Sequence, residues 1–206
     1  MEGLIYFKDG KLIANSGDVS VYSMNNELFL ELGPGHNLWA LESEYHDYIT
    51  QMWDMPKGCC LEIGLGLGVA SRCILSNPNV RSLTTVEKNK DVIMVQEKVS
   101  AVLDDGSRAH KWQYSKDRHR IVNQDGLIYL YETKRKYDFV FIDCYSHIDD
   151  ETLPQIKDMV YASKKILAKD GIILCWFDKY TPNEYVQGFF DLFDSYIPKA
   201  SKELRR

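Results

Sequence analysis

The chain has 206 residues, of which 45% are hydrophobic and 27% charged, and its formal net charge at pH 7 is −5. This length and composition suit a globular protein with one domain, or one domain and a small appendage. The negative net charge argues against nucleic acid as a partner, because proteins that bind the phosphate backbone carry a basic excess.

The N-terminal residues 1–36 are expected to form a small antiparallel β appendage. Short β-like runs alternate here with Asp9-Gly10 and Asn25-Asn26, pairs that are typical of tight hairpin turns. The appendage is interpreted as a dimerisation or lid element, or as a sheet that only extends the core. We therefore expect a homodimer through residues 1–36 as one outcome, and an α/β domain over residues 37–206. The predicted strands are Leu4–Phe7, Lys11–Ala14, Val19–Ser23 and Glu27–Leu32.

A helix is predicted to run from about Leu38 to Trp53, with Asn37 as its N-cap. Tyr45 lies on the apolar stripe of this helix, where a tyrosine usually belongs to the core. The adjacent His46 points about 100° away from Tyr45, so the two cannot both be central core residues. The residues that share the helical spacing are Leu38, Leu41, Tyr45, Tyr48, Ile49, Met52 and Trp53.

A glycine-rich turn follows the first buried strand of the α/β domain and is the strongest motif of the chain. The stretch Cys59–Gly68 reads as a strand that runs into this turn, and a helix is predicted from Val69 to Ser76. Its alternate glycines are Gly64, Gly66 and Gly68. Glycines let the backbone approach a ligand closely, and the helix points its free N–H groups at that ligand. The alternative is a turn whose glycines only allow close packing.

The spacing of these glycines separates two classes of ligand. The dinucleotide fingerprint G-x-G-x-x-G requires a third glycine where this chain has Val69 or Ser71, so the fingerprint fails in both registers. The pattern that remains is acid-x-G-x-G-x-G, with Glu62 in the acidic position.

Acidic residues follow the next two predicted strands. The strand Ser82–Val86 ends at Glu87, where an acid can accept both hydroxyls of a ribose. The strand Arg120–Asn123 leads to Asp125-Gly126, where an acid can bind the amino group of an adenine. Alternatively, Glu87 is a charge near a helix N-terminus and Asp125-Gly126 is only a turn. Helices are predicted over residues 89–103 and 126–131, and residues 104–118 are expected to form a loop.

The clearest strand of the chain, Tyr137–Ile142, ends in the sequence Asp143–His147. Ligands lie outside the carboxyl ends of the strands in open parallel sheets, so we expect this sequence to face the reacting atoms. The alternation of strands and helices predicts a mainly parallel sheet with right-handed crossovers and the strand order 3-2-1-4-5. The remaining predicted elements are a helix over residues 150–167, a strand over 171–177, a helix over 182–193 and a frayed basic tail over 199–206.

With these motifs, the chain resembles the class I methyltransferase superfamily, and within it the spermidine synthases, which are polyamine aminopropyltransferases. The glycine turn resembles motif I, whose ligand is S-adenosylmethionine. The other segments that are similar to family motifs are Glu42–Asp47 (D-E-x-x-Y-H-E), Thr85–Glu87 (V-E-I-D), Asp125-Gly126 (D-G), Tyr137–Cys144 (F-D-V-I-I-x-D-C) and Lys169–Ile172 (E-D-G).

The resemblance implies a Rossmann-like α/β fold, S-adenosylmethionine or its decarboxylated form as the cofactor, and a small-molecule acceptor, with no metal. It implies that Asp143 is the base; the alternative is that Asp143 only caps the following helix. His147 is a second candidate for the base, because the unperturbed pKa of histidine suits that role. The residues expected to bind the cofactor are Glu62, Gly64, Gly66, Gly68, Glu87, Asp125 and Gly126. The residues expected to bind the acceptor are Tyr45, His46, Tyr145, Ser146 and His147.

Two departures from the family pattern bear on the reaction. Leu67 stands where the family has an aspartate, which would attract the ammonium of a decarboxylated donor and repel a carboxylate. Ser146 stands where the family has a second aspartate near the acceptor. These departures favour a methyltransferase with an amine-containing acceptor. The alternatives are a divergent aminopropyltransferase and a non-catalytic nucleotide-binding protein.

The remaining features concern the environment of the chain. Its five cysteines are odd in number and lack the spacing of metal ligands, which favours reduced thiols. We find no signal peptide and no run of about 18 apolar residues, so we expect a cytoplasmic protein without a membrane partner.

Overall fold

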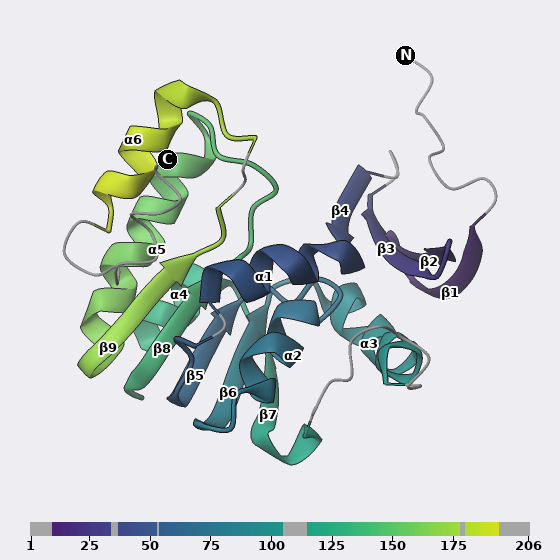
Figure 1. Ribbon diagram of the computed structural model, residues 1–206, viewed down its shortest axis with the longest axis horizontal. Coiled ribbons are helices and arrows are strands. Elements are labelled where there is room, and N and C mark those ends of the chain that lie inside the picture. Colours follow the sequence, from purple (N-terminus) through teal and green to yellow (C-terminus); the bar gives the residue numbers. More distant parts are fainter. Residues whose placement is uncertain (1–9, 34–36, 53, 105–114, 178–179, 194–206) are drawn as a thin grey trace.

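The computed structural model describes residues 10–33, 37–52, 54–104, 115–177 and 180–193. Its centre is a five-stranded parallel sheet with the order β7-β6-β5-β8-β9, which confirms the predicted order 3-2-1-4-5 (Figure 1). The strands are β5 (Gly58–Ile63), β6 (Val80–Glu87), β7 (His119–Asn123), β8 (Tyr137–Ile142) and β9 (Leu167–Cys175). Strand β9 begins four residues before the predicted start at residue 171.

Helices cover both faces of this sheet. Successive residues of a strand point to opposite faces, so Phe139 and Phe141 of β8 pack in one core cluster while Val140 and Ile142 pack in another. The first cluster lies under α1 (Tyr45–Met52), α2 (Val69–Ser76) and α3 (Lys90–Leu103). The second lies under α4 (Gly126–Glu132), α5 (Thr152–Ile166) and α6 (Asn183–Asp191). Strands buried on both faces explain the continuous apolar runs in the sequence.

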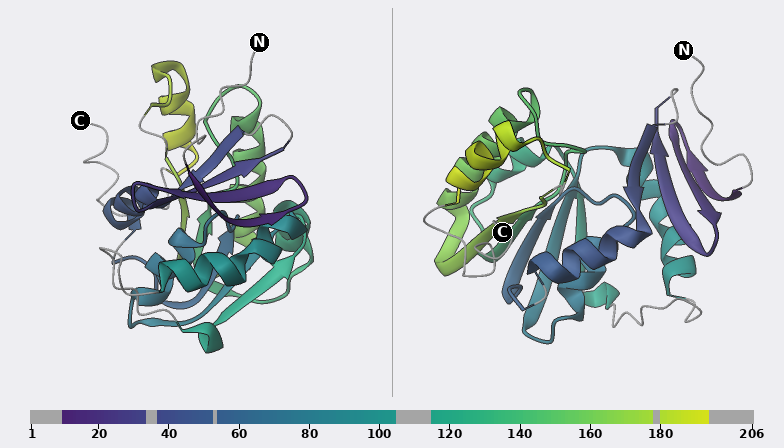
Figure 2. Two further views of the ribbon diagram at one scale, coloured as in Figure 1. Left: turned by 90° about the vertical axis from the view of Figure 1, so that its right-hand side faces the viewer. Right: turned by 45° about the horizontal axis from the view of Figure 1, so that its top comes forward.

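The N-terminal segment forms a separate antiparallel sheet with the order β1-β2-β3-β4. Strands β1 and β2 contact α3, so the appendage lies beside one edge of the parallel sheet (Figure 2). The strands are β1 (Lys11–Ser16), β2 (Val19–Met24), β3 (Glu27–Leu32) and β4 (Asn37–Leu41). Three of the predicted strands are confirmed, and the fourth, Leu4–Phe7, lies outside the described residues.

The predicted helix over 38–53 is wrong in its first part. Residues 37–41 form strand β4, in which Ala40 pairs with Leu30 and Asn37 with Leu32, so Asn37 is not a helix cap. A 3₁₀ turn over Glu42–Glu44 follows, and α1 begins only at Tyr45. Pairing with β3 outweighs the helical periodicity of this stretch, and the antiparallel sheet therefore extends past residue 36 to Leu41. Among the described residues, no helix is long and apolar enough to cross a bilayer.

Candidate active site

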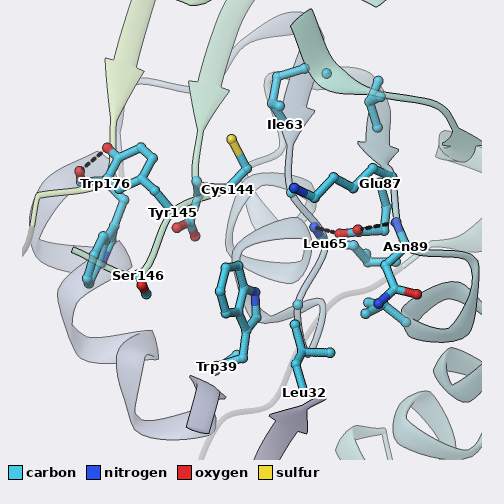
Figure 3. A pocket seen from close by; sticks show the side chains of 18 of the residues that line it. Leu32, Trp39, Ile63, Leu65, Glu87, Asn89, Cys144, Tyr145, Ser146 and Trp176 are labelled. Carbon is cyan, nitrogen blue, oxygen red and sulfur yellow. Dashed lines mark hydrogen bonds between the residues drawn. The ribbon is translucent and has the colours of Figure 1, made fainter. Parts of the chain in front are cut away.

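A cavity of about 390 Å³ opens at the carboxyl ends of the parallel strands, where the order of the sheet reverses between β5 and β8. This is where open α/β sheets bind ligands, and the volume lies in the range of small-molecule sites. In Figure 3, Trp39 of β4 projects into the cavity between Leu65 and Glu87 on one side and Tyr145 and Ser146 on the other. The N-terminal sheet therefore supplies one wall of the site.

The glycine turn after β5 forms the floor of the cavity. Gly64 and Gly66 line it, and both have positive φ angles, of 100° and 48°. A Cβ atom on Gly64 would lie 1.9 Å from the carbonyl oxygen of Asp143, so only glycine fits where β5 and β8 meet. Gly68 does not line the cavity; it is the left-handed residue that precedes α2. Two glycines of the turn thus line the cavity, and the third immediately precedes the helix.

Glu62 lies below this floor and does not line the cavity. Its side chain is 1% exposed, and one carboxylate oxygen accepts hydrogen bonds from the hydroxyls of Ser71 and Thr85. Burial raises the pKa of Glu62 to about 8. The structure therefore gives the acid of the motif a packing role between β5, α2 and β6, and does not bring it to the predicted ligand.

Glu87, at the end of β6, lines the cavity as predicted. One carboxylate oxygen accepts from the N–H of Leu65 at 3.0 Å, and the other accepts from the N–H of Asn89 at 2.7 Å (Figure 3). The side chain therefore ties the glycine turn to the end of β6. Each oxygen of a carboxylate can accept a second hydrogen bond, so Glu87 can still receive ribose hydroxyls.

Asp125 and Gly126 also line the cavity, at the start of α4. One oxygen of Asp125 accepts from the N–H groups of Leu127 and Ile128, at 2.9 and 3.1 Å, so this residue is the N-cap of the helix. Its second oxygen remains available to a ligand.

Asp143 lines the cavity at the end of β8 and accepts a hydrogen bond of 2.7 Å from the hydroxyl of Tyr48 on α1. Burial raises the pKa of Asp143 to about 7, while the bond from Tyr48 acts in the opposite direction. Asp143 does not cap α5, because Asp149 accepts the N–H groups of Glu151 and Thr152. The alternative of a purely capping role for Asp143 is therefore wrong.

Glu44 and Tyr48 are site residues that the sequence prediction missed. The Tyr48 hydroxyl lies 3.3 Å from Glu44, which lines the cavity, and 2.7 Å from Asp143. Burial, and after it the charge of Asp143, raises the pKa of Glu44 to about 8. Tyr48 falls on the apolar stripe of the predicted helix, and Glu44 falls at a variable position of the resembled motif, so neither residue carries a signal in the sequence.

The other predicted acceptor residues are divided between the cavity and the surface. Tyr145 and Ser146 line the cavity, and the Tyr145 hydroxyl donates to the carbonyl of Trp176 (Figure 3). Tyr45 and His46 do not line it. The side chain of His147 is 59% exposed and lies 2.8 Å from Asp149, outside the cavity. The structure thus brings two of these five residues to the site.

Leu67, at the position where the resembled family has an aspartate, does not line the cavity either. Its side chain is 2% exposed and belongs to the core cluster under α1, α2 and α3. An apolar residue suits this environment. Leu67 does not line the cavity, so the choice of donor does not follow from this position.

Comparison with known proteins places this geometry in a family. The spermine/spermidine synthase domain matches residues 42–189, which are 148 of the 206 residues. The chain belongs to this family. A polyamine aminopropyltransferase from Ruegeria sp. (strain TM1040) is 25% identical over 133 residues, which cover 63% of this chain and 45% of that protein.

Solved structures show the same fold. The spermidine synthase from Thermotoga maritima aligns with a TM-score of 0.59 and 19% identity, over 87% of this chain and 60% of that one. A putative S-adenosylmethionine-dependent methyltransferase from Streptococcus mutans aligns with a TM-score of 0.54 and 14% identity, over 87% of this chain and 46% of that one. The chain spans about half of the length of its curated relative, and the fold is common to both kinds of transferase.

Proposed function

We propose that this family member is a transferase that moves the aminopropyl group of decarboxylated S-adenosylmethionine to a small amine acceptor. The observation that carries the proposal is the charge of the cavity. Among the described residues, four carboxylates line it, and Lys88 is the single lysine or arginine. The carboxylates are Glu44, Glu87, Asp125 and Asp143.

This charge suits the decarboxylated donor better than the intact one. The decarboxylated donor carries a sulfonium and an ammonium, whereas intact S-adenosylmethionine also carries a carboxylate. A carboxylate placed about 5 Å from an ionised acid costs about 3 kcal/mol at an effective dielectric constant of about 20. Lys88 follows Glu87 directly at the end of β6, and its single positive charge, which acts on Cys144, is outnumbered by the four acids of the lining.

The proposed step is a direct displacement. The acceptor nitrogen attacks the methylene carbon bound to sulfur, the carbon–sulfur bond breaks, and its electron pair stays on sulfur as 5′-methylthioadenosine is released. The attacking nitrogen must be neutral, yet aliphatic amines are protonated at pH 7. Asp143 accepts that proton, since its carboxylate lines the cavity and the Tyr48 hydroxyl stabilises its ionised form.

Methyl transfer from intact S-adenosylmethionine is the second candidate, favoured by the presence of Lys88 as a partner for the methionine carboxylate. Family membership and the name of the Ruegeria relative support aminopropyl transfer instead. Glu44 also weighs against methyl transfer, because it brings to the cavity, from another element, a carboxylate that Ser146 does not supply.

Calorimetric titration of the protein with the two donors, side by side, tests the proposal. We expect the decarboxylated donor to bind at least about tenfold more tightly, which corresponds to about 1.4 kcal/mol. A tenfold preference for intact S-adenosylmethionine would favour methyl transfer. Absence of binding by both donors and by 5′-methylthioadenosine would favour a non-catalytic protein.

A further inference from the structure

The carboxylates of Glu44 and Asp143 meet at one hydroxyl group. Their oxygens lie 3.3 and 2.7 Å from the Tyr48 hydroxyl, so they are at most about 6 Å apart, the sum of the two distances. Both residues line the cavity, and Tyr48 between them is 5% exposed. The two acids come from different elements, Glu44 from the 3₁₀ turn before α1 and Asp143 from the end of β8.

Among the described residues, no lysine or arginine forms an ion pair with Glu44 or Asp143. The partners of Glu44 are the backbone near Leu41 and the Tyr48 hydroxyl, and the nearby Asp47 adds a further negative charge. The single described basic group of the cavity lining, Lys88, follows β6. Two half-buried acids at this separation oppose each other's ionisation, and a cation between them would relieve the repulsion.

The position of this pair bears on the missing acid of the glycine turn. Leu67 is packed in the core, so the turn itself offers no charged side chain to the cavity. A Cβ atom on Gly66 would lie 3.4 Å from Ala40, which precedes Glu44 by four residues on the same segment. The segment that carries Glu44 therefore lies directly beside the turn.

We propose that Glu44 is a specificity-determining residue that, together with Asp143, binds a primary ammonium group of a ligand, and so supplies the negative charge that position 67 lacks. The inference rests on the proposed function, in which both the donor and the acceptor carry such a group. The ammonium group of the decarboxylated donor can form an ion pair with Glu44 and Asp143. The ammonium group of the acceptor can do the same as the acceptor approaches Asp143.

The test compares Glu44→Gln with the wild-type protein by calorimetry. Asp47→Asn is the matched control, because it removes one negative charge from the same segment at a residue that does not line the cavity. Glu44→Asp keeps the charge and serves as the conservative variant. The probes are 5′-methylthioadenosine, which has no ammonium group, decarboxylated S-adenosylmethionine, and 1,4-diaminobutane added to protein saturated with 5′-methylthioadenosine.

We expect Glu44→Gln to bind 5′-methylthioadenosine as the wild type does, and to lose about tenfold or more in affinity for an ammonium ligand. A loss confined to the decarboxylated donor assigns the donor ammonium to the pair, and a loss confined to the diamine assigns the acceptor ammonium. Asp47→Asn should stay within about twofold of the wild type, and Glu44→Asp should retain most of the affinity.

Three results would overturn the inference. These are unchanged affinity of Glu44→Gln for both ammonium ligands, an equal loss for 5′-methylthioadenosine, and an equal loss in Asp47→Asn. Failure of the proposed function gives a different result. In that case the wild-type protein would bind intact S-adenosylmethionine more tightly than the decarboxylated donor, independently of the affinities of the variants.

Discussion

Two pairs of carboxylates line the cavity and differ in how they are held. Glu87 and Asp125, at the proposed nucleoside end, accept hydrogen bonds from backbone N–H groups of the glycine turn, the β6–α3 loop and the first turn of α4. Glu44 and Asp143, at the proposed reactive end, share a single tyrosine hydroxyl as their side-chain donor. The first pair holds the loops in place and keeps its remaining lone pairs for a ligand. The second pair has fewer hydrogen-bond donors and no ion pair with a described lysine or arginine.

This difference separates positioning from chemistry. A carboxylate that is held by several N–H groups is fixed in position, which suits the recognition of hydroxyl and amino groups. A buried carboxylate with one donor has a raised pKa and can exchange a proton near neutral pH, which suits a base. Asp143, whose pKa is raised to about 7 by burial, belongs to the second class.

The largest expected effect is at Asp143. Asp143→Asn keeps the hydrogen-bonding shape of the side chain but cannot take a proton, so we expect turnover to fall by about 100-fold or more. Binding of 5′-methylthioadenosine and the melting temperature should be nearly unchanged, because the nucleoside end is intact. Turnover is measured as 5′-methylthioadenosine released from the decarboxylated donor. Near-normal turnover would remove Asp143 as the base.

The next effect is at Glu87. Glu87→Ala removes the acceptor for ribose hydroxyls and for two backbone N–H groups, so nucleoside binding should weaken by about 1–3 kcal/mol. Calorimetry with 5′-methylthioadenosine measures this change, and Glu132→Ala, an acid on the exposed surface of α4, is the control. Equal affinity in the Glu87 variant and the wild type would show that the Glu87 carboxylate only holds the two loops in place and does not bind the ribose.

The pH dependence of the reaction tests the reactive end. Asp143 must be ionised to act, so kcat/KM should fall by about tenfold for each pH unit below about 7 and level off above it. Tyr48→Phe removes the hydroxyl that favours the ionised form, so the midpoint should move to higher pH. A midpoint that stays in place in this variant would show that the Tyr48 bond does not control the base.

The smallest effect is expected at His147. Its ring is exposed and lies beside Asp149 rather than in the cavity, so His147→Ala should change kcat and KM by no more than about twofold. A loss comparable to that of Asp143→Asn would mean that the loop after β8 closes over the ligand and that His147 acts as a base.

The sequence was sufficient to bring Gly64, Glu87 and Asp125 to the cavity, and insufficient to find Glu44 and Tyr48. Gly64, Glu87 and Asp125 follow three strands of a parallel sheet, and topology alone brings such residues together. Glu44 lines the cavity, and Tyr48 contacts Glu44 and Asp143 behind it, because β4 pairs with β3 and shifts the start of α1 to Tyr45. That pairing is a tertiary contact that helical periodicity cannot reveal.

Leu67 is a residue that the motif places at the site and that the fold buries elsewhere. Its place in the motif predicts a side chain in contact with the donor, yet packing against the helices buries it in the core. The acid that does line this region lies 23 positions earlier in the chain, at Glu44. The charge of the cavity therefore depends on residues from several elements that lie close together in the fold, and it cannot be predicted from one position of the motif.

The most direct test of the account is a product assay with both donors. The protein is incubated with a diamine and either decarboxylated or intact S-adenosylmethionine, and the nucleoside products are separated by chromatography. We expect 5′-methylthioadenosine from the decarboxylated donor and no turnover of the intact one. Formation of S-adenosylhomocysteine from intact S-adenosylmethionine, with the decarboxylated donor left unreacted, would contradict it.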